Sequence, residues 1–133
     1  KKLNLSPCAM RKQYHFRKVG EDTYIWDVDQ LILQSSHLPV IQVCLDEIKE
    51  LDESYWFPNH YPTTQELIDH FQLVQEADLI YPIILCPEGR IMDGMHRVAK
   101  AKMMNLNALQ AVKFEVMPQP HFINVDEDDL SYD

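Results

Sequence analysis

Residues 87–101 read PEGRIMDGMHRVAKA, and the fold and the site are predicted outward from this stretch. Pro, Glu and Gly at its start form a turn signal between two short apolar runs, which predicts a hairpin. The second run ends at Asp93-Gly94, and good helix formers occupy residues 95–105. The stretch therefore predicts a turn, a short strand and a helix in direct succession.

The start of this helix is a candidate anion site. A helix N-terminus leaves backbone N–H groups unpaired and carries a partial positive charge. Gly94 just before it allows a ligand to approach the main chain closely. Arg97 adds a planar set of donors suited to phosphate, and His96 adds one or two more. Lys100 lies one turn beyond His96 on the same face and is expected to reach the same anion.

A plain structural interpretation of the same residues stays open. Asp93 can cap the helix, Gly94 can simply permit a tight turn, and His96 and Arg97 can form an ordinary solvated helix start. Spacing alone does not choose between this interpretation and the anion site.

The elements around this stretch predict an α+β protein. The helix that begins at Thr63 has a capping box with Glu66, and its core stripe is expected at Leu67, Ile68, Phe71 and Val74. Strands and helices do not alternate regularly, which favours the α+β class, a small mixed sheet packed against helices. The other predicted elements are a hairpin over 14–26, a helix over 29–37, a short helix over 46–51 and strands over 40–45, 82–86 and 110–116.

Residues 82–99, with their two strands, the glycine turn and the Gly-Met-His-Arg motif, resemble the core of the ParB/sulfiredoxin-like superfamily, which includes the ParB-like nuclease domain family. The opening strand and short helix of that core resemble residues 39–48, and its middle helix resembles the one that begins at Thr63. The resemblance divides the chain into a hairpin and helix extension over 1–38, the core over 39–117 and an acidic C-terminal tail over 118–133.

The resemblance implies a nucleotide-binding protein. Members of the superfamily bind nucleotide phosphates at the glycine turn and the following helix, so Gly94, Met95, His96 and Arg97 are expected to line a phosphate pocket. The nucleotide expected is ATP or CTP, with Mg²⁺ as a possible companion. Methionine stands at position 95, where sulfiredoxins have their catalytic cysteine, and a thioether supplies no thiolate nucleophile. Sulfiredoxin chemistry is therefore excluded, and phosphoryl transfer to a small molecule or nucleotide hydrolysis remains.

Phosphoryl transfer needs acidic and proton-transferring groups near the phosphates. Asp93 and His96 are the candidate catalytic residues. Glu47, Glu50 and Glu53 are weaker candidates, because most helical carboxylates are solvated.

The formal charge of −9, from 21 acidic and 12 basic residues, argues against nucleic acid as a partner, because such binding depends on Lys and Arg at phosphates. Four acidic residues, 126–129, lie in the tail, which we expect to be solvated and unstructured. The alternatives to nucleotide binding are a ParB-like nuclease or DNA-binding protein that uses the same His96 and Arg97, and a non-enzymatic interaction module.

Three cysteines, Cys8, Cys44 and Cys86, are far apart and form no zinc-binding spacing, so we expect reduced thiols, with Cys44 and Cys86 buried in apolar strands. We expect no metal site. The sequence shows neither a membrane span nor a signal peptide, and a cytoplasmic protein is the simplest expectation. Aromatic residues over 55–61 are expected to anchor a long loop to the core, or alternatively to stack on a ligand.

Overall fold

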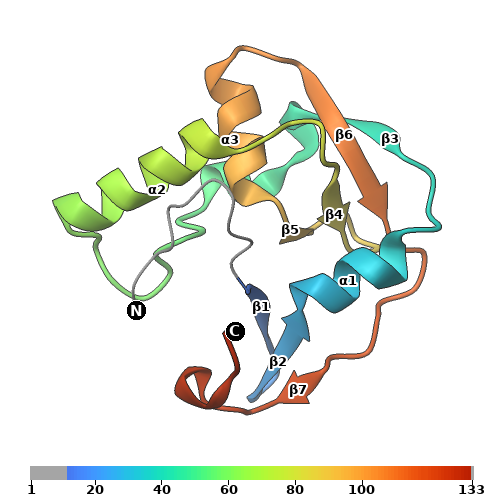
Figure 1. The fold of residues 1–133 in the computed structure, drawn as a ribbon, viewed down its shortest axis with the longest axis vertical. Coiled ribbons are helices and arrows are strands. Elements are labelled where there is room, and N and C mark those ends of the chain that lie inside the picture. Colours follow the sequence, from blue (N-terminus) through green and yellow to red (C-terminus); the bar gives the residue numbers. More distant parts are fainter. Residues whose placement is uncertain (1–11, 133) are drawn as a thin grey trace.

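The structure is a computed structural model that describes residues 12–132. Within that range it is a mixed α+β protein with two sheets and three α-helices, so the predicted class is confirmed (Figure 1). The helices are α1 (Val28–Ser35), α2 (Thr64–Glu76) and α3 (Met95–Met103). The strands are β1 (Tyr14–Val19), β2 (Asp22–Asp27), β3 (Ile41–Cys44), β4 (Ile83–Leu85), β5 (Ile91–Asp93), β6 (Ala108–Lys113) and β7 (Phe122–Ile123).

The central sheet has four strands in the order β3-β6-β4-β5. β4 runs parallel to β6, while β3 pairs antiparallel with β6 and β5 pairs antiparallel with β4. β4 and β5 form the predicted hairpin around Gly89, whose φ of 84° lies in the left-handed region that glycine tolerates. The chain passes directly from β5 into α3 through Gly94, as the sequence predicts.

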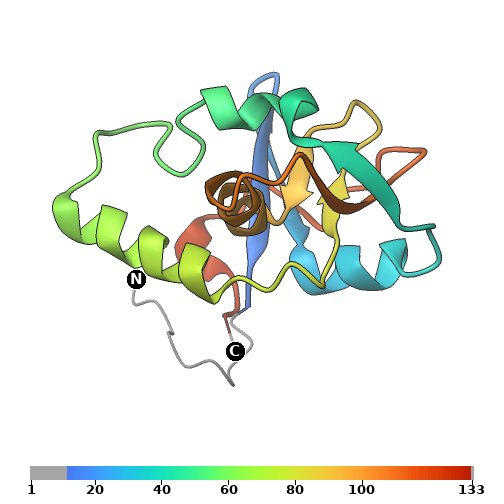
Figure 2. The ribbon, with the colours of Figure 1, turned by 90° about the horizontal axis from the view of Figure 1, so that it is seen from above.

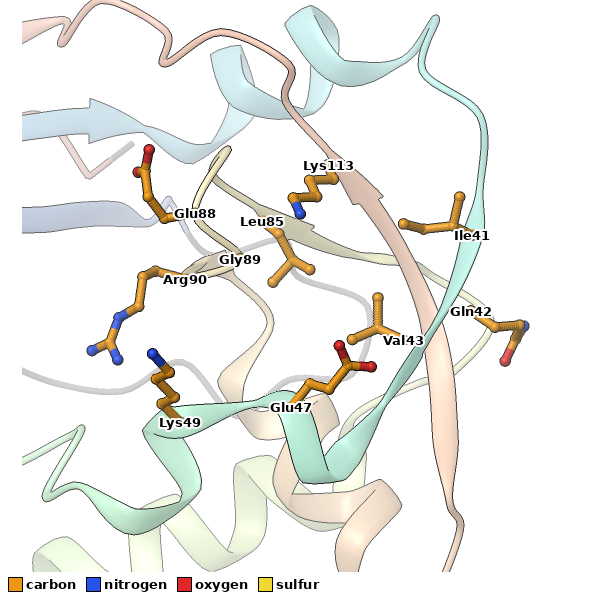
Figure 3. A pocket seen from close by; sticks show the side chains of 10 residues that line it. All are labelled: Ile41, Gln42, Val43, Glu47, Lys49, Leu85, Glu88, Gly89, Arg90 and Lys113. Carbon is orange, nitrogen blue, oxygen red and sulfur yellow. The ribbon is translucent and has the colours of Figure 1, made fainter.

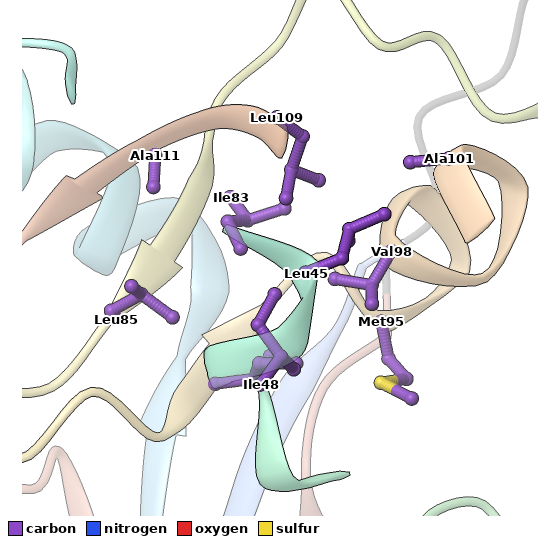
Figure 4. Close-up of a cluster of buried hydrophobic side chains, with 10 residues drawn as sticks. Leu45, Ile48, Ile83, Leu85, Met95, Val98, Ala101, Leu109 and Ala111 are labelled. Atoms are coloured by element: carbon purple, nitrogen blue, oxygen red, sulfur yellow. The ribbon is translucent and has the colours of Figure 1, made fainter. Parts of the chain in front are cut away.

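One face of the central sheet packs against α3 and two 3₁₀ turns, Leu45–Glu47 and Lys49–Asp52 (Figure 4). The sequence predicts a short helix here, and the chain instead forms these two shorter turns. Val98 and Ala101 of α3 are fully buried against the sheet. The cluster on this face also contains Leu45, Ile48, Ile83, Leu85, Ile91, Met95, Leu109 and Ala111. Apolar burial on this face therefore fixes the position of α3.

The opposite face of the central sheet packs against α1 and β2. Trp26 of β2 and Leu31 of α1 are fully buried there, together with Ile84, Met92 and Val112 from three central strands. Asp27 caps α1 by accepting from the backbone N–H groups of its first turn. The described part of the N-terminal extension thus covers one side of the core.

The C-terminal segment is folded against the N-terminal hairpin. β7 pairs with β2 to complete a second, three-stranded sheet in the order β1-β2-β7. The Trp26 Nε1–H donates to the Pro118 carbonyl at 3.0 Å, the Tyr14 hydroxyl donates to the Ser131 carbonyl, and Leu130 is buried. The acidic side chains over 126–129 are exposed, as expected, but the expectation of an unstructured tail is wrong, because apolar and main-chain contacts hold the segment in place.

Helix α2 begins at the predicted capping box, in which Thr63 and Glu66 bond reciprocally. Its predicted core stripe is wrong apart from Val74, which is 4% exposed. Phe71 is 57% exposed and Ile68 is 49% exposed, because α2 contacts α3 along one edge and extends away from the central sheet (Figures 1 and 2). An amphipathic pattern therefore located the helix but overestimated how much of it is covered.

Strand β3 lies at the edge of the central sheet, which explains the different burial of the two described cysteines. Cys44 on β3 is exposed, so its predicted burial is wrong, whereas Cys86 after β4 is buried as expected. Cys8 lies outside the described residues. Over 12–132, no helix is both long enough and apolar enough to span a bilayer.

A half-buried histidine in β1, whose Nε2 is buried, predicts a pH dependence of stability. Within the described chain, His15 Nε2 is buried with no hydrogen-bond partner, and burial, with a smaller contribution from the Arg17 charge, lowers the pKa of His15 to about 3. The unfolded chain takes up a proton here below about pH 6.5, while the folded chain does not until pH approaches 3. The free energy of unfolding therefore decreases as pH falls through this interval. The contribution of His15 to this decrease is at most about 1.4 kcal/mol per pH unit.

We expect His15→Phe to reduce this loss, since phenylalanine has no proton to bind. The measurement is urea unfolding at several pH values between about 7 and 4, compared with wild type. His37→Phe, at an exposed histidine, is the control and should keep the wild-type slope. An unchanged slope in His15→Phe would refute the assignment.

Candidate functional site

The first turn of α3 starts at a glycine that no other residue can replace without strain. Gly94 has φ 111°, and a Cβ added to it would lie 2.5 Å from Ile83 Cγ2 on β4. Glycine therefore lets α3 begin in direct contact with the central sheet. The absence of a side chain also means that Gly94, the N-cap residue of α3, offers the first turn no capping oxygen.

Of the three helices between residues 12 and 132, α3 alone has no side-chain cap at its N-terminus. Asp93, which the plain structural interpretation assigns to capping, bonds to Arg97 instead. Thus no side-chain oxygen caps the positive end of the α3 dipole, and the capped-helix alternative does not describe this turn.

Arg97 points back toward the sheet and fastens α3 to two segments. Its Nη1 donates to the carbonyls of Tyr81 and Pro82 at 2.9 and 2.7 Å, and its Nη2 donates to Asp93 Oδ2 at 2.8 Å. The Arg97 and Asp93 side chains are only 16% and 10% exposed. The planar guanidinium therefore positions the start of α3, which is a different task from the direct phosphate contact that the sequence predicts for it.

Lys100 is directed to the end of α2. Its Nζ donates to the carbonyls of Gln75 and Ala77 at 2.8 and 2.6 Å, where a helix C-terminus leaves carbonyls unpaired and carries partial negative charge. The structure therefore places Lys100 in a contact between helices, apart from the group that it brings together around Gly94. Met95 lies in that group but packs into the core, at 8% exposure.

His96 belongs to a pair of histidines covered by a tryptophan. His96 Nε2 lies 2.8 Å from His70 Nδ1 on α2, and the planes of the two rings are nearly parallel, 15° apart. Trp56 stacks on both rings, with centroid distances of 4.7 Å to each. The side chain predicted to face an anion is therefore held in place by two other elements.

Sequence reasoning missed His70 and Trp56 as partners of His96. His70 is separated from His96 by 26 positions and Trp56 by 40, and no spacing rule links residues on a loop and two helices. The one signal was the position of the aromatic loop directly before α2. Trp56 and Tyr55 of that loop pack against the core, as the anchoring interpretation expects, while Tyr61 is 97% exposed.

Of the weaker acidic candidates, Glu50 is buried at 2% exposure, so its expected solvation is wrong. Its Oε2 accepts from the Ile91 backbone N–H at 2.7 Å and lies 3.3 Å from Arg90 Nε, and these two contacts offset part of the cost of burying the carboxylate. Within the described residues, its Oε1 is buried with no hydrogen-bond partner. Glu53 pairs with Arg90 at 2.8 Å and Glu47 is exposed. Burial, followed by the charges of Glu50 and Asp93, raises the pKa of Tyr55 to about 12.

Within residues 12–132, no three or more His, Cys, Asp or Glu side chains are grouped as they would be around a metal ion.

Comparisons of the chain with protein-family models, with curated proteins and with solved structures find no match. The resemblance to the ParB/sulfiredoxin-like superfamily therefore rests on the sequence pattern over residues 39–116 alone.

The close contact at Gly94 predicts a large effect of a single methyl group. Gly94→Ala should lower the free energy of unfolding by about 1–2 kcal/mol through backbone strain and by a further ~1–3 kcal/mol through the clash with Ile83. Gly89→Ala is a matched control, because Gly89 also has positive φ but has nothing within 4 Å of an added Cβ. Urea unfolding measures both, and equal losses would disprove the close-packing argument.

The role of Arg97 is tested separately. Arg97→Met keeps the aliphatic stem and removes the donors, so we expect a loss of about 1–3 kcal/mol in unfolding free energy as the partly buried Asp93 carboxylate and Pro82 carbonyl lose their partner. Lys102→Met, at an exposed position on the same helix, should stay within about 0.5 kcal/mol of wild type. Thermal or urea unfolding decides, and a fully stable Arg97→Met protein would contradict the structural role.

Proposed function

We propose that this protein binds the phosphate of a nucleotide at the first turn of α3, with Gly94, Met95, His96 and Arg97 forming the site. The observation that carries the proposal is the N-terminus of α3, which begins at a left-handed glycine and has no side-chain cap. Backbone N–H groups at such a turn are natural donors to a phosphate oxygen. The resemblance of the Gly-Met-His-Arg motif to the ParB/sulfiredoxin-like superfamily supports the same ligand.

In this proposal the four residues have different tasks. Gly94 starts α3 against Ile83 and brings no capping side chain, so its lack of a side chain leaves the first-turn N–H groups for the phosphate, and Met95 packs into the core. His96 supplies an imidazole that His70 and Trp56 hold in one orientation. Arg97 acts as a positioning residue, because its donors already bond to protein oxygens and fix the angle at which α3 leaves the sheet.

The reaction we propose is phosphoryl transfer to a small molecule or hydrolysis of the nucleotide. His96 would move a proton at the edge of the site, and the Asp93 carboxylate would accept one from an attacking hydroxyl or water. Asp93 is suited to this because its ion pair with Arg97 fixes the direction of the carboxylate. Mg²⁺ arriving with ATP or CTP would neutralise phosphate charge, with Asp93 as the nearest carboxylate by sequence. Cytoplasmic nucleotide pools would supply the ligand.

The proposal is tested by titrating the protein with ATP, CTP and ADP, each with and without Mg²⁺, by calorimetry and by amide chemical shifts. We expect at least one nucleotide to bind and the shifts to centre on residues 94–97. His96→Ala should weaken binding about tenfold or more, the range for a hydrogen bond to a charged group. His37→Ala, at an exposed histidine remote in sequence, is the control and should bind as wild type does.

Two outcomes would contradict the proposal. One is the absence of binding by wild-type protein at millimolar nucleotide. The other is binding whose shifts lie away from the start of α3.

A further inference from the structure

A pocket lies at the other end of β5 from the start of α3. It encloses about 260 Å³ and is bounded by β3, the first 3₁₀ turns and the β4–β5 turn (Figure 3). None of its lining residues belongs to the proposed phosphate site. A ligand bound in this pocket would therefore be a different molecule from the nucleotide, and its binding would not depend on the proposed function.

The floor of this pocket is apolar because part of the central sheet is left uncovered. Ile41, Val43 and Leu85 lie on the same sheet face as the core cluster beneath α3, as the strand registers require. Leu85 is buried, whereas Ile41 on the edge strand is 40% exposed. The face therefore continues outward from the core into the pocket and offers an apolar surface to a ligand.

The rim of the pocket carries side chains of both charges, which are Glu47, Lys49, Glu88, Arg90 and Lys113. Lys49 and Arg90 extend from neighbouring segments with their cationic groups on one side, while the Glu47 carboxylate reaches toward Val43 (Figure 3). Arg90 already pairs with Glu50 and Glu53. Within the described residues, Lys49 and Glu47 form no side-chain hydrogen bond or ion pair, and both are exposed.

The geometry points to a free α-amino acid with an apolar side chain as the ligand of this pocket. Such a zwitterion carries a carboxylate, an ammonium group and an apolar side chain on one carbon atom. The carboxylate would pair with Lys49, because Arg90 is already held by Glu50 and Glu53. The ammonium group would pair with Glu47, and the side chain would lie on Ile41, Val43 and Leu85. A simple anion would meet repulsion from Glu47, and a purely apolar molecule would leave Glu47 and Lys49 without partners.

Lys113 determines which side chain is accepted. Its amine extends from β6 over Leu85, on the opposite side of the floor from Lys49 (Figure 3). A cationic side chain placed on the floor would meet this charge, so lysine and arginine should be rejected in favour of leucine, isoleucine or valine.

The inference is tested by calorimetric titration of the wild-type chain with L-leucine as the probe. Three analogues each remove one group: leucinamide lacks the carboxylate, 4-methylpentanoate lacks the ammonium group, and glycine lacks the apolar side chain. We expect leucine to bind. Each analogue should have an affinity lower by a factor of about ten or more, since each loses one contact. Failure of leucine to bind at millimolar concentration, or equal binding of any analogue, would overturn the inference.

Variants locate the binding to this pocket. Glu47→Gln and Lys49→Gln change charge but little in size, and both side chains are exposed, so the fold should persist. Each should weaken leucine binding about tenfold, and Lys113→Gln should admit L-lysine as a ligand. Lys102→Gln, an exposed lysine on α3 outside the pocket, should bind leucine as wild type does. Undiminished binding by both Glu47→Gln and Lys49→Gln would place leucine elsewhere and refute the inference.

Discussion

The guanidinium of Arg97 is the interaction on which the arrangement around α3 depends. It joins the carboxylate at the end of β5 to two main-chain carbonyls that precede β4. One planar group therefore fixes a helix to both ends of the β4–β5 hairpin. The Asp93 carboxylate and the Pro82 carbonyl are partly buried, and each would carry a desolvation cost without its donor. Gly94 makes the arrangement possible by removing the one side chain that would separate the helix from Ile83.

Local signals in the sequence predicted where most helices and strands occur. They did not predict which side chains of these elements are buried. The capping box at Thr63, the turn at Gly89 and the glycine before α3 each act over a few residues, and each was predicted where it occurs. Burial depends on which elements meet, and so the exposure of Phe71 and the burial of Glu50 were predicted wrongly. A helix pattern reports an apolar face but does not report whether another element covers it.

The same limit applies to the candidate site. The sequence identified Gly94, Arg97 and His96 as neighbours because they are consecutive or nearly so. It assigned Arg97 to a ligand, since a guanidinium beside a helix start is equally suited to a phosphate and to protein carbonyls. The partners of His96 come from a loop and another helix, and only the tertiary structure brings Trp56 and His70 together. The sequence therefore indicated which residues lie at the start of α3. The contacts that each side chain makes there depend on long-range packing.

The pairing of β7 with β2 has a consequence for synthesis of the chain. The Thr23 backbone N–H donates to Asn124, which lies 101 positions later, and the Trp26 indole donates to Pro118. On the ribosome, the N-terminal hairpin therefore emerges early but lacks these partners until almost all of the described sequence has been made. Its sheet edge and the tryptophan that it buries stay accessible during that interval, when nascent chains are most exposed to mispairing and to chaperones.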